Sequence, residues 1–359
     1  MGVQSSAASG SRAAVIDQGP PAAAPERAAR ERRVQQGSGR GAAVAAYANV
    51  IATLAALAVI DGCARERPAE VTPAADPSIA ASDLRTPGLA GQQVTCAGPR
   101  TKTFALTVRE GEVDLGMATR FHAWTYDGRL PGPTLEACEG DTVTITVHNT
   151  AAIAHGLDTH ALTIDARKFG PTEPGETLTI QGTAATPGVF MYHCSVGPVT
   201  DIHIKSGMHG PMIVYPRGVA LRPAYEAVVV QDAIFGERDA DGVILGGDTQ
   251  RMKRNDPEFR LFNGRLEHEP RHVVAGELVR LYLVNVGPGV SAAHVVGGMF
   301  DAVIDGSTII HAVQTYAVAP GAGAILEFRV PEPGEFVLVD HDQLGFLPLG
   351  LGLRFVAER

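Results

Sequence analysis

The chain has 359 residues, a formal net charge of −9 at pH 7, 41 glycines and 24 prolines. This length accommodates two domains and a tail. The acidic net charge does not give the basic footprint of a nucleic-acid-binding protein, so we expect no nucleic-acid partner. Abundant turn residues and short β-branched runs after residue 100 favour an all-β protein.

The N-terminal part of the chain differs in composition from the rest. Residues 1–40 are rich in Ala, Gly, Ser and Arg without an apolar period, which predicts a disordered basic region. Residues 41–63 begin with an uncharged apolar run, 41–60, directly after that basic flank, a pattern typical of a signal or membrane-anchor segment. Residues 64–92 are rich in proline and small residues, which predicts a linker. We therefore expect the remainder to be exported, periplasmic or at the cell surface, with membrane anchoring left open.

The four cysteines divide into separate groups. Cys63 ends the apolar run, and Cys194 lies in a histidine-rich motif. Cys96 and Cys138 could form a disulfide in an oxidising compartment, joining the start of the first domain to a strand. The same pattern is equally consistent with two unpaired cysteines.

One β-domain pattern occurs twice in the chain after residue 93. Each copy contains acidic glycine turns followed by alternating strands, and Pro-Gly turns that open further strands. The matching segments are 138–149 with 274–285, 174–180 with 320–326, and 187–193 with 333–341. Short strands between Pro and Gly turns predict two tandem Greek-key β-sandwiches, over 93–217 and 218–359.

Two histidines in the first copy are an odd number of residues apart. In an extended segment, His155 and His160 point to opposite faces because side chains alternate along a strand. Asp158 shares its parity with His160. A carboxylate therefore lies on the same side as the second histidine.

A later segment supplies the donor types of a blue-copper site. Cys194 is followed by His203 and Met208, and cysteine, histidine and a long axial methionine are ligands of such sites. His193 precedes the cysteine directly, so the two side chains face opposite ways and cannot easily bind one metal. The simplest pairing is Cys194 with His155.

His193 then pairs with His160, and the sequence predicts two metals. A copper held only by histidines would be open to substrate, and Asp158 could relay protons to it.

These residues occur in motifs that resemble the copper-containing nitrite reductases, a family of two cupredoxin domains. The resemblance covers roughly residues 95–359. Its motifs are Asp127–Thr134, His155–His160, Tyr192–Met208, Phe262–Gly264, His294–Gly297 and Val339–His341.

The resemblance implies two coppers per subunit and a role for each site residue. A type 1 copper would be bound by His155, Cys194, His203 and Met208. A type 2 copper would be bound by His160, His193 and His341, the last from a neighbouring subunit. Asp158 and His294 would deliver protons during catalysis.

The activity that the resemblance implies is reduction of nitrite to nitric oxide. Electrons would pass from type 1 copper through Cys194 and His193 to type 2 copper. The implied partners are nitrite, a small electron donor of the cupredoxin or c-type cytochrome kind, and two further copies of the chain in a homotrimer.

Several positions depart from the family pattern. Gly156 stands where asparagine is usual, Thr159 replaces a common aromatic residue, and Ile202 stands where many members have tryptophan. The segment 345–350 is also atypical. Six histidines have no partner pattern and are interpreted as surface or turn residues: His122, His148, His209, His268, His272 and His311.

Two other functions remain alternatives. A laccase-like two-domain multicopper oxidase needs His-x-His pairs for its trinuclear cluster, but the chain contains none, and Ser195 follows the cysteine. A non-catalytic exported electron-transfer cupredoxin needs only the type 1 ligands. It would leave five residues without a role: His160, His193, Asp158, His294 and His341.

Overall fold

The computed structural model describes residue 96 and residues 100–341 and 351–359, all within one compact unit, Pro73–Arg359. The predicted disordered, anchor and linker segments fall outside the described residues, as does 345–350. Among the described residues, no helix is both long and apolar enough to cross a membrane.

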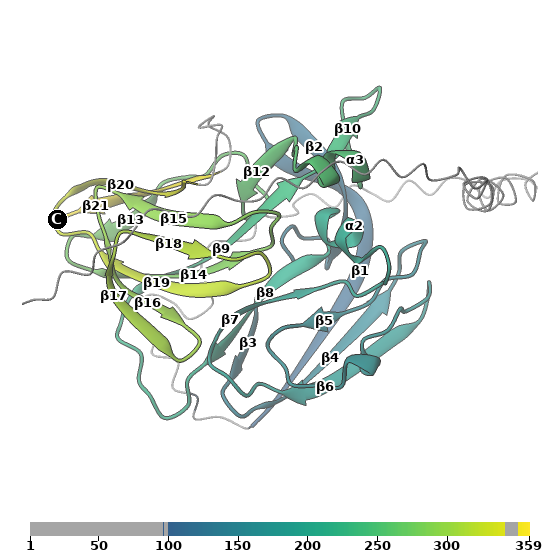
Figure 1. The fold of residues 1–359 in the computed structure, drawn as a ribbon, viewed down its shortest axis with the longest axis horizontal. Coiled ribbons are helices and arrows are strands. Elements are labelled where there is room, and N and C mark those ends of the chain that lie inside the picture. Colours follow the sequence, from purple (N-terminus) through teal and green to yellow (C-terminus); the bar gives the residue numbers. More distant parts are fainter. Residues whose placement is uncertain (1–95, 97–99, 342–350) are drawn as a thin grey trace, which may run out of the picture. The chain divides into compact units, whose positions relative to one another are not determined.

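The first sandwich consists of a six-stranded and a four-stranded sheet (Figure 1). The larger sheet has the order β10 (Gly236–Arg238), β11 (Ile244–Gly246), β2 (Thr119–Tyr126), β1 (Thr101–Gly116), β4 (Thr142–Asn149) and β6 (Thr177–Thr183). The smaller sheet has the order β3 (Leu135–Cys138), β8 (His209–Tyr215), β7 (Gly188–His193) and β5 (Asp158–Thr159). Strand β4 shows why these sheets pack: Val143, Ile145 and Val147 are buried while the intervening threonines are not.

The second sandwich repeats this plan. Its six-stranded sheet has the order β12 (Phe259–Phe262), β9 (Tyr225–Ile234), β14 (Leu278–Asn285), β19 (Gly323–Arg329), β16 (Phe300–Asp305) and β17 (Thr308–Val313). Its five-stranded sheet has the order β13 (Arg271–Val274), β21 (Gly352–Glu358), β20 (Gly334–Asp340), β15 (Ser291–Val296) and β18 (Thr315–Val318). Two short helices, α2 (Thr200–Lys205) and α3 (Thr249–Arg254), and a 3₁₀ turn, Ala166–Lys168, complete the described elements.

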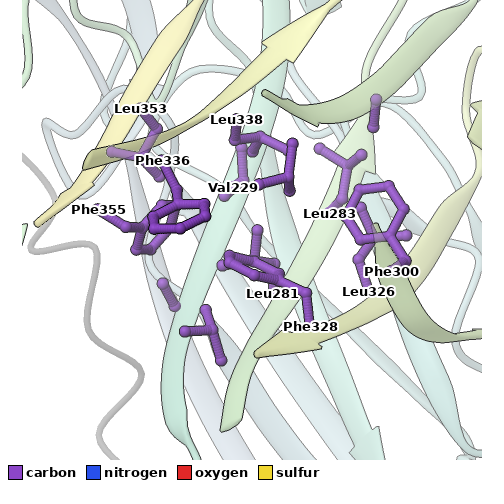
Figure 2. Packing of buried hydrophobic residues seen from close by; sticks show 14 of the residues in the cluster. Val229, Leu281, Leu283, Phe300, Leu326, Phe328, Phe336, Leu338, Leu353 and Phe355 are labelled. Atoms are coloured by element: carbon purple, nitrogen blue, oxygen red, sulfur yellow. The ribbon is translucent and has the colours of Figure 1, made fainter. Parts of the chain in front are cut away.

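Strand β14 is buried along its whole length because it has an apolar neighbour on both faces. Leu281 and Leu283 join the core of the second sandwich, which also contains Phe328 and Phe355 (Figure 2). Tyr282 and Val284 point the other way, into a cluster with Val189 and Met191 of β7. Apolar burial of this kind contributes about 25 cal/mol per Å², so this second cluster binds the two sandwiches together.

The strand pairing confirms the internal duplication. Strand β4 pairs in parallel with β1 and antiparallel with β6, and β14 pairs in the same way with β9 and β19. Asn149 at the end of β4 and Asn285 at the end of β14 make equivalent hydrogen bonds. Each donates to two carbonyls and accepts from the backbone amide two residues later.

The structure bears on two points that the sequence left undecided: the pairing of Cys96 with Cys138 and the boundary between the domains. Cys96 and Cys138 are joined by a disulfide, with their Cα atoms 5.7 Å apart, so the unpaired alternative is wrong. The short strand β11 comes from beyond residue 217 yet pairs with β2 of the first sandwich, and β10 pairs with β11. The two halves are therefore interlocked at this edge, while the predicted division at residues 217 and 218 stays a prediction.

Candidate metal centres

Three potential metal donors meet inside the first sandwich. Cys194 directly follows β7, His203 lies on α2, and His155 lies in the loop before β5. The Cys194 Sγ atom is 3.4 Å from His203 Nδ1 and 3.9 Å from His155 Nδ1, and the two Nδ1 atoms are 3.1 Å apart. Among the described residues of one chain, this is the one group of three or more histidine, cysteine or acidic side chains whose donor atoms all lie within 4.8 Å of one another.

The pKa shifts in this cluster leave its imidazole nitrogens unprotonated. Burial, and secondarily His203, lowers the pKa of His155 to about 4, and burial also lowers the pKa of His203. Both imidazoles are therefore neutral near pH 7 and keep a lone pair for a metal. Burial raises the pKa of the Cys194 thiol, so metal binding is what would displace its proton.

The fourth expected ligand, Met208, is fully buried in the same apolar cluster as Cys194. Its amide donates to the His203 carbonyl, and its own carbonyl accepts from the Cys194 amide. The backbone thus ties the three segments together. Two imidazoles, a thiol and a nearby thioether form the donor set that selects copper, so the residues fit the predicted type 1 site.

The departure at Gly156 has a steric explanation. Its amide lies 3.4 Å from Cys194 Sγ, within range of a hydrogen bond to sulfur. A Cβ added there would lie 2.6 Å from both the Gly170 carbonyl oxygen and Ser195 Oγ. The neighbouring loop therefore occupies the space that an asparagine side chain would need.

Trp124 of β2 is a neighbour that the sequence did not indicate. Its ring centroid lies 4.8 Å from that of His203 and 5.4 Å from that of His155. Nothing in the spacing of a single tryptophan could have placed it there, because it lies far from both histidines in sequence.

A second pair of histidines lies on the other side of β7. His160 Nε2 and His193 Nε2 are 3.1 Å apart, and Asp158 Oδ2 is 4.0 Å from His193 Nε2. Strand register explains this, since Asp158 lies opposite His193 in the β5–β7 pair. The structure therefore brings together the residues that alternation along the strands assigns to one face.

Hydrogen bonds fix how the two imidazoles are oriented. His160 Nδ1 is 2.9 Å from the Gly321 carbonyl oxygen, and His193 Nδ1 is 2.8 Å from that of Cys194. A carbonyl accepts, so each Nδ1 carries a proton. In the neutral imidazoles both Nε2 lone pairs then face each other, an arrangement that a bound cation stabilises.

The remaining expected site residues lie together in the second sandwich. The rings of His294 and His341 have centroids 5.0 Å apart. His294 Nδ1 is 2.7 Å from the Gln314 carbonyl oxygen, and the His341 amide donates to the Ala292 carbonyl. His341 is exposed and His294 half-buried. Within the described part of one chain, this pair forms no metal-binding cluster with His160 and His193.

One histidine was misjudged from the sequence. His209 was interpreted as a surface or turn residue, but it is 1% exposed and lies opposite His193 in the β7–β8 pair. Its Nε2 lies 3.4 Å from Asp232 Oδ2, and its Nδ1 lies 3.0 Å from the Ile204 carbonyl oxygen. Its partner comes from β9, far along the chain, which local sequence patterns do not reveal. His148, His272 and His311 are exposed, as expected.

Comparison with known proteins gives consistent results. The model of the family described as "Multicopper oxidase" matches residues 107–218. The copper-containing nitrite reductase of Neisseria gonorrhoeae is 36% identical over 243 residues, which cover 64% of this chain and 61% of that protein. The chain thus spans about three fifths of the length of this relative. The copper-containing nitrite reductase of Alcaligenes xylosoxydans xylosoxydans is 29% identical, over 77% of this chain and 93% of that protein.

Solved structures agree in fold. The copper nitrite reductase of Nitrosomonas europaea superposes with a TM-score of 0.66 at 31% identity, covering 72% of this chain and 94% of that one. A multicopper oxidase crystal structure superposes with a TM-score of 0.63 at 28% identity. Two tandem sandwiches with a buried His–Cys–His cluster define a cupredoxin-type protein. The chain belongs to the copper-containing nitrite reductase family.

Proposed function

We propose that this protein reduces nitrite to nitric oxide with two coppers per subunit. The observation that carries the proposal is the division at the end of β7. Cys194 belongs to the buried cluster with His155 and His203, whereas His193, the preceding residue, faces His160 and Asp158. One peptide bond then separates a buried electron-accepting centre from one with an accessible carboxylate.

The residues would act as follows. Copper bound by His155, Cys194, His203 and Met208 would accept electrons, and copper bound by His160, His193 and His341 would hold nitrite and reduce it. The covalent bonds of the adjacent residues Cys194 and His193 would carry electrons from the first copper to the second.

Protons are supplied by the chain itself. Nitrite, one electron and two protons give nitric oxide and water, so one nitrite oxygen must leave carrying both protons. Asp158 is positioned beside His193 to deliver a proton to that oxygen, and His294 would deliver the second.

The second half of the site would come from another subunit. His341 and His294 share one edge of the second sandwich, so an assembly that supplies His341 to a neighbouring His160 and His193 supplies His294 as well. A head-to-tail ring closes such contacts, and we propose the homotrimer. We further propose export, nitrite as substrate, and a cupredoxin or c-type cytochrome as electron donor.

The proposal is tested by nitrite-dependent nitric oxide release from copper-loaded protein with a reduced donor. Asp158→Asn and His294→Ala should each lower the rate by about a hundredfold or more, because each removes a proton donor. Both variants should retain the visible absorption of the type 1 centre. A wild-type protein that released no nitric oxide while it consumed oxygen would contradict the proposal.

Copper content separates the alternatives. The absence of any His-x-His pair in the sequence removes ligands that the oxidase needs. The electron-carrier alternative leaves the facing Nε2 atoms of His160 and His193 without a function. Two coppers per subunit support the reductase, one supports the carrier, and four support the oxidase.

A further inference from the structure

A buried ion pair joins the loop that carries two type 1 ligands to the second sandwich. Lys205, on α2, lies between His203 and Met208 in sequence. Its Nζ atom donates to Asp232 Oδ1 at 2.7 Å and to the Val286 carbonyl at 3.2 Å, and it also contacts the Gly287 carbonyl. All three N–H groups of the ammonium therefore have acceptors, and all three acceptors belong to the second sandwich or the loop after β14.

Asp232 holds the same loop at a second point. Its other oxygen, Oδ2, lies 3.4 Å from His209 Nε2, and His209 Nδ1 lies 3.0 Å from the Ile204 carbonyl oxygen. The Lys205 and Asp232 side chains are 8% and 4% exposed. The carboxylate thus contacts the chain on both sides of Met208, from a strand that contributes no donor to the His155–Cys194–His203 cluster.

A buried ion pair is not explained by stability alone. Removing two charges from water is unfavourable, and well-packed apolar residues often stabilise a protein as much or more. Such a pair instead imposes one geometry, because only one arrangement satisfies all its donors and acceptors. Here the segment placed in one arrangement is the segment from His203 to Met208.

We propose that Asp232 is a positioning residue for the type 1 centre, which it acts on through Lys205 and His209. The second sandwich thereby sets the placement of His203 and Met208, and with it the reduction potential of a copper bound there. This inference rests on the copper binding of the proposed function but not on its substrate.

The test replaces the pair by apolar residues of similar size, Lys205→Met with Asp232→Leu. A matched control is Arg217→Met with Asp141→Leu. In that pair Asp141 is buried and Arg217 is partly buried, and the two bond to Glu139, Cys96 and Cys138 and not to the ligand loop.

Three readouts are compared between the two double variants. The first is the visible and electron paramagnetic resonance spectrum of the copper-loaded protein. The second is the equilibrium constant for electron exchange with a reference donor, which should change about tenfold or more, as expected when a support of a ligand is removed. The third is hydrogen exchange of the metal-free protein at the amides of residues 203–209, which should become faster.

The control variant should show none of these changes. Unchanged spectrum, equilibrium constant and exchange in the folded Lys205→Met, Asp232→Leu variant would overturn the inference. If that variant does not fold, Asp232→Asn should shift the same readouts in the same direction, and unchanged values there would overturn it equally.

A protein that binds copper and fails to reduce nitrite would refute the proposed function alone, since none of the readouts involves nitrite. The exchange measurement requires no metal at all. A loop whose exchange is unaffected would therefore count against the inference even where copper is not retained.

Discussion

The two sandwiches place different chemistry at the same point of one fold. In the first, Asp158 of β5 lies opposite His193 of β7, and in the second, His294 of β15 lies opposite Val339 of β20. By this register Cys194 corresponds to Asp340. The first sandwich thus has a thiol where the second has a carboxylate.

The surroundings of these two residues differ accordingly. Asp340 is buried and accepts hydrogen bonds from Gln231 Nε2 and the Ala292 amide, and Gln231 Oε1 accepts from Ser291 Oγ at 2.6 Å. This network satisfies the polar side chains of Asp340, Gln231 and Ser291 internally. At the equivalent position in the first sandwich, nitrogen and sulfur donors face one another. The same position in a duplicated fold can therefore either be satisfied by internal hydrogen bonds or provide the ligands of a metal.

The largest expected effect concerns the proposed type 2 copper site, which would combine ligands from the first sandwich of one subunit and the second sandwich of its neighbour. His193→Ala and His341→Ala should each reduce nitrite-dependent nitric oxide release to background, because each removes a ligand of the same proposed copper. In hybrids assembled from equal amounts of both variants, about a quarter of the sites should be intact if the ring is head-to-tail. The measurement is activity after co-refolding, and hybrids without recovered activity would contradict a shared site.

The equivalent asparagines allow a direct comparison of the sandwiches. Asn149→Ala and Asn285→Ala each leave buried backbone groups unpaired, so each should lower the free energy of unfolding by about 2–4 kcal/mol. Only Asn149 binds Thr172, whose backbone pairs with that of His155. Chemical denaturation should show similar losses, while the type 1 spectrum should change in Asn149→Ala alone. A spectrum altered equally by both substitutions would argue against local control of His155.

Acid should destabilise the metal-free protein through the buried imidazoles of the first sandwich. The folded-state pKa of His155 is lowered from 6.5 to about 4 by burial. Its contribution to stability is therefore complete above pH 6.5 and is lost as the pH falls towards 4. The loss should be on the order of 3 kcal/mol, at about 1.4 kcal/mol per pKa unit.

Denaturant unfolding at several pH values between 7 and 4 measures this effect. His155→Leu serves as the control, because it removes one titrating group and should make the loss of stability over that range smaller by about the same amount. An equally steep loss in the variant would assign the acid sensitivity to other groups.

The smallest effect is expected at Gly156. In Gly156→Ala, the added Cβ would press on the Gly170 carbonyl and Ser195 Oγ, so the free energy of unfolding should fall by about 1–3 kcal/mol. Gly111→Ala is a suitable control, since a Cβ there has nothing within 4 Å. Thermal unfolding compares the two. If both substitutions had the same effect, crowding would not explain why glycine occupies position 156.

The sequence predicted the architecture because its signals are local. Alternating strands such as 142–149 and repeated turn residues identify two sandwiches. Because neighbouring residues of a strand point to opposite faces, the same alternation assigns His193 and Cys194 to different sites. These patterns needed no knowledge of distant contacts. The family resemblance added His341 and His294, which parity could not place.

What the sequence did not predict depends on contacts between distant segments. The burial of His209 and the pairing of Lys205 with Asp232 both require β9 to pack beside α2. The approach of Gly170 to Gly156 likewise comes from two loops that meet only after folding. Tertiary contacts of this kind carry no periodicity, so no window of the sequence contains them.

The central claim is that adjacent residues His193 and Cys194 belong to two different metal centres. Copper content together with electron paramagnetic resonance of wild type, Cys194→Ser and His193→Ala tests it most directly. We predict two coppers per subunit in the wild type, loss of only the type 1 signal and visible band in Cys194→Ser, and loss of only the type 2 signal in His193→Ala. If both substitutions removed the same copper and left the same signal, the claim would be wrong.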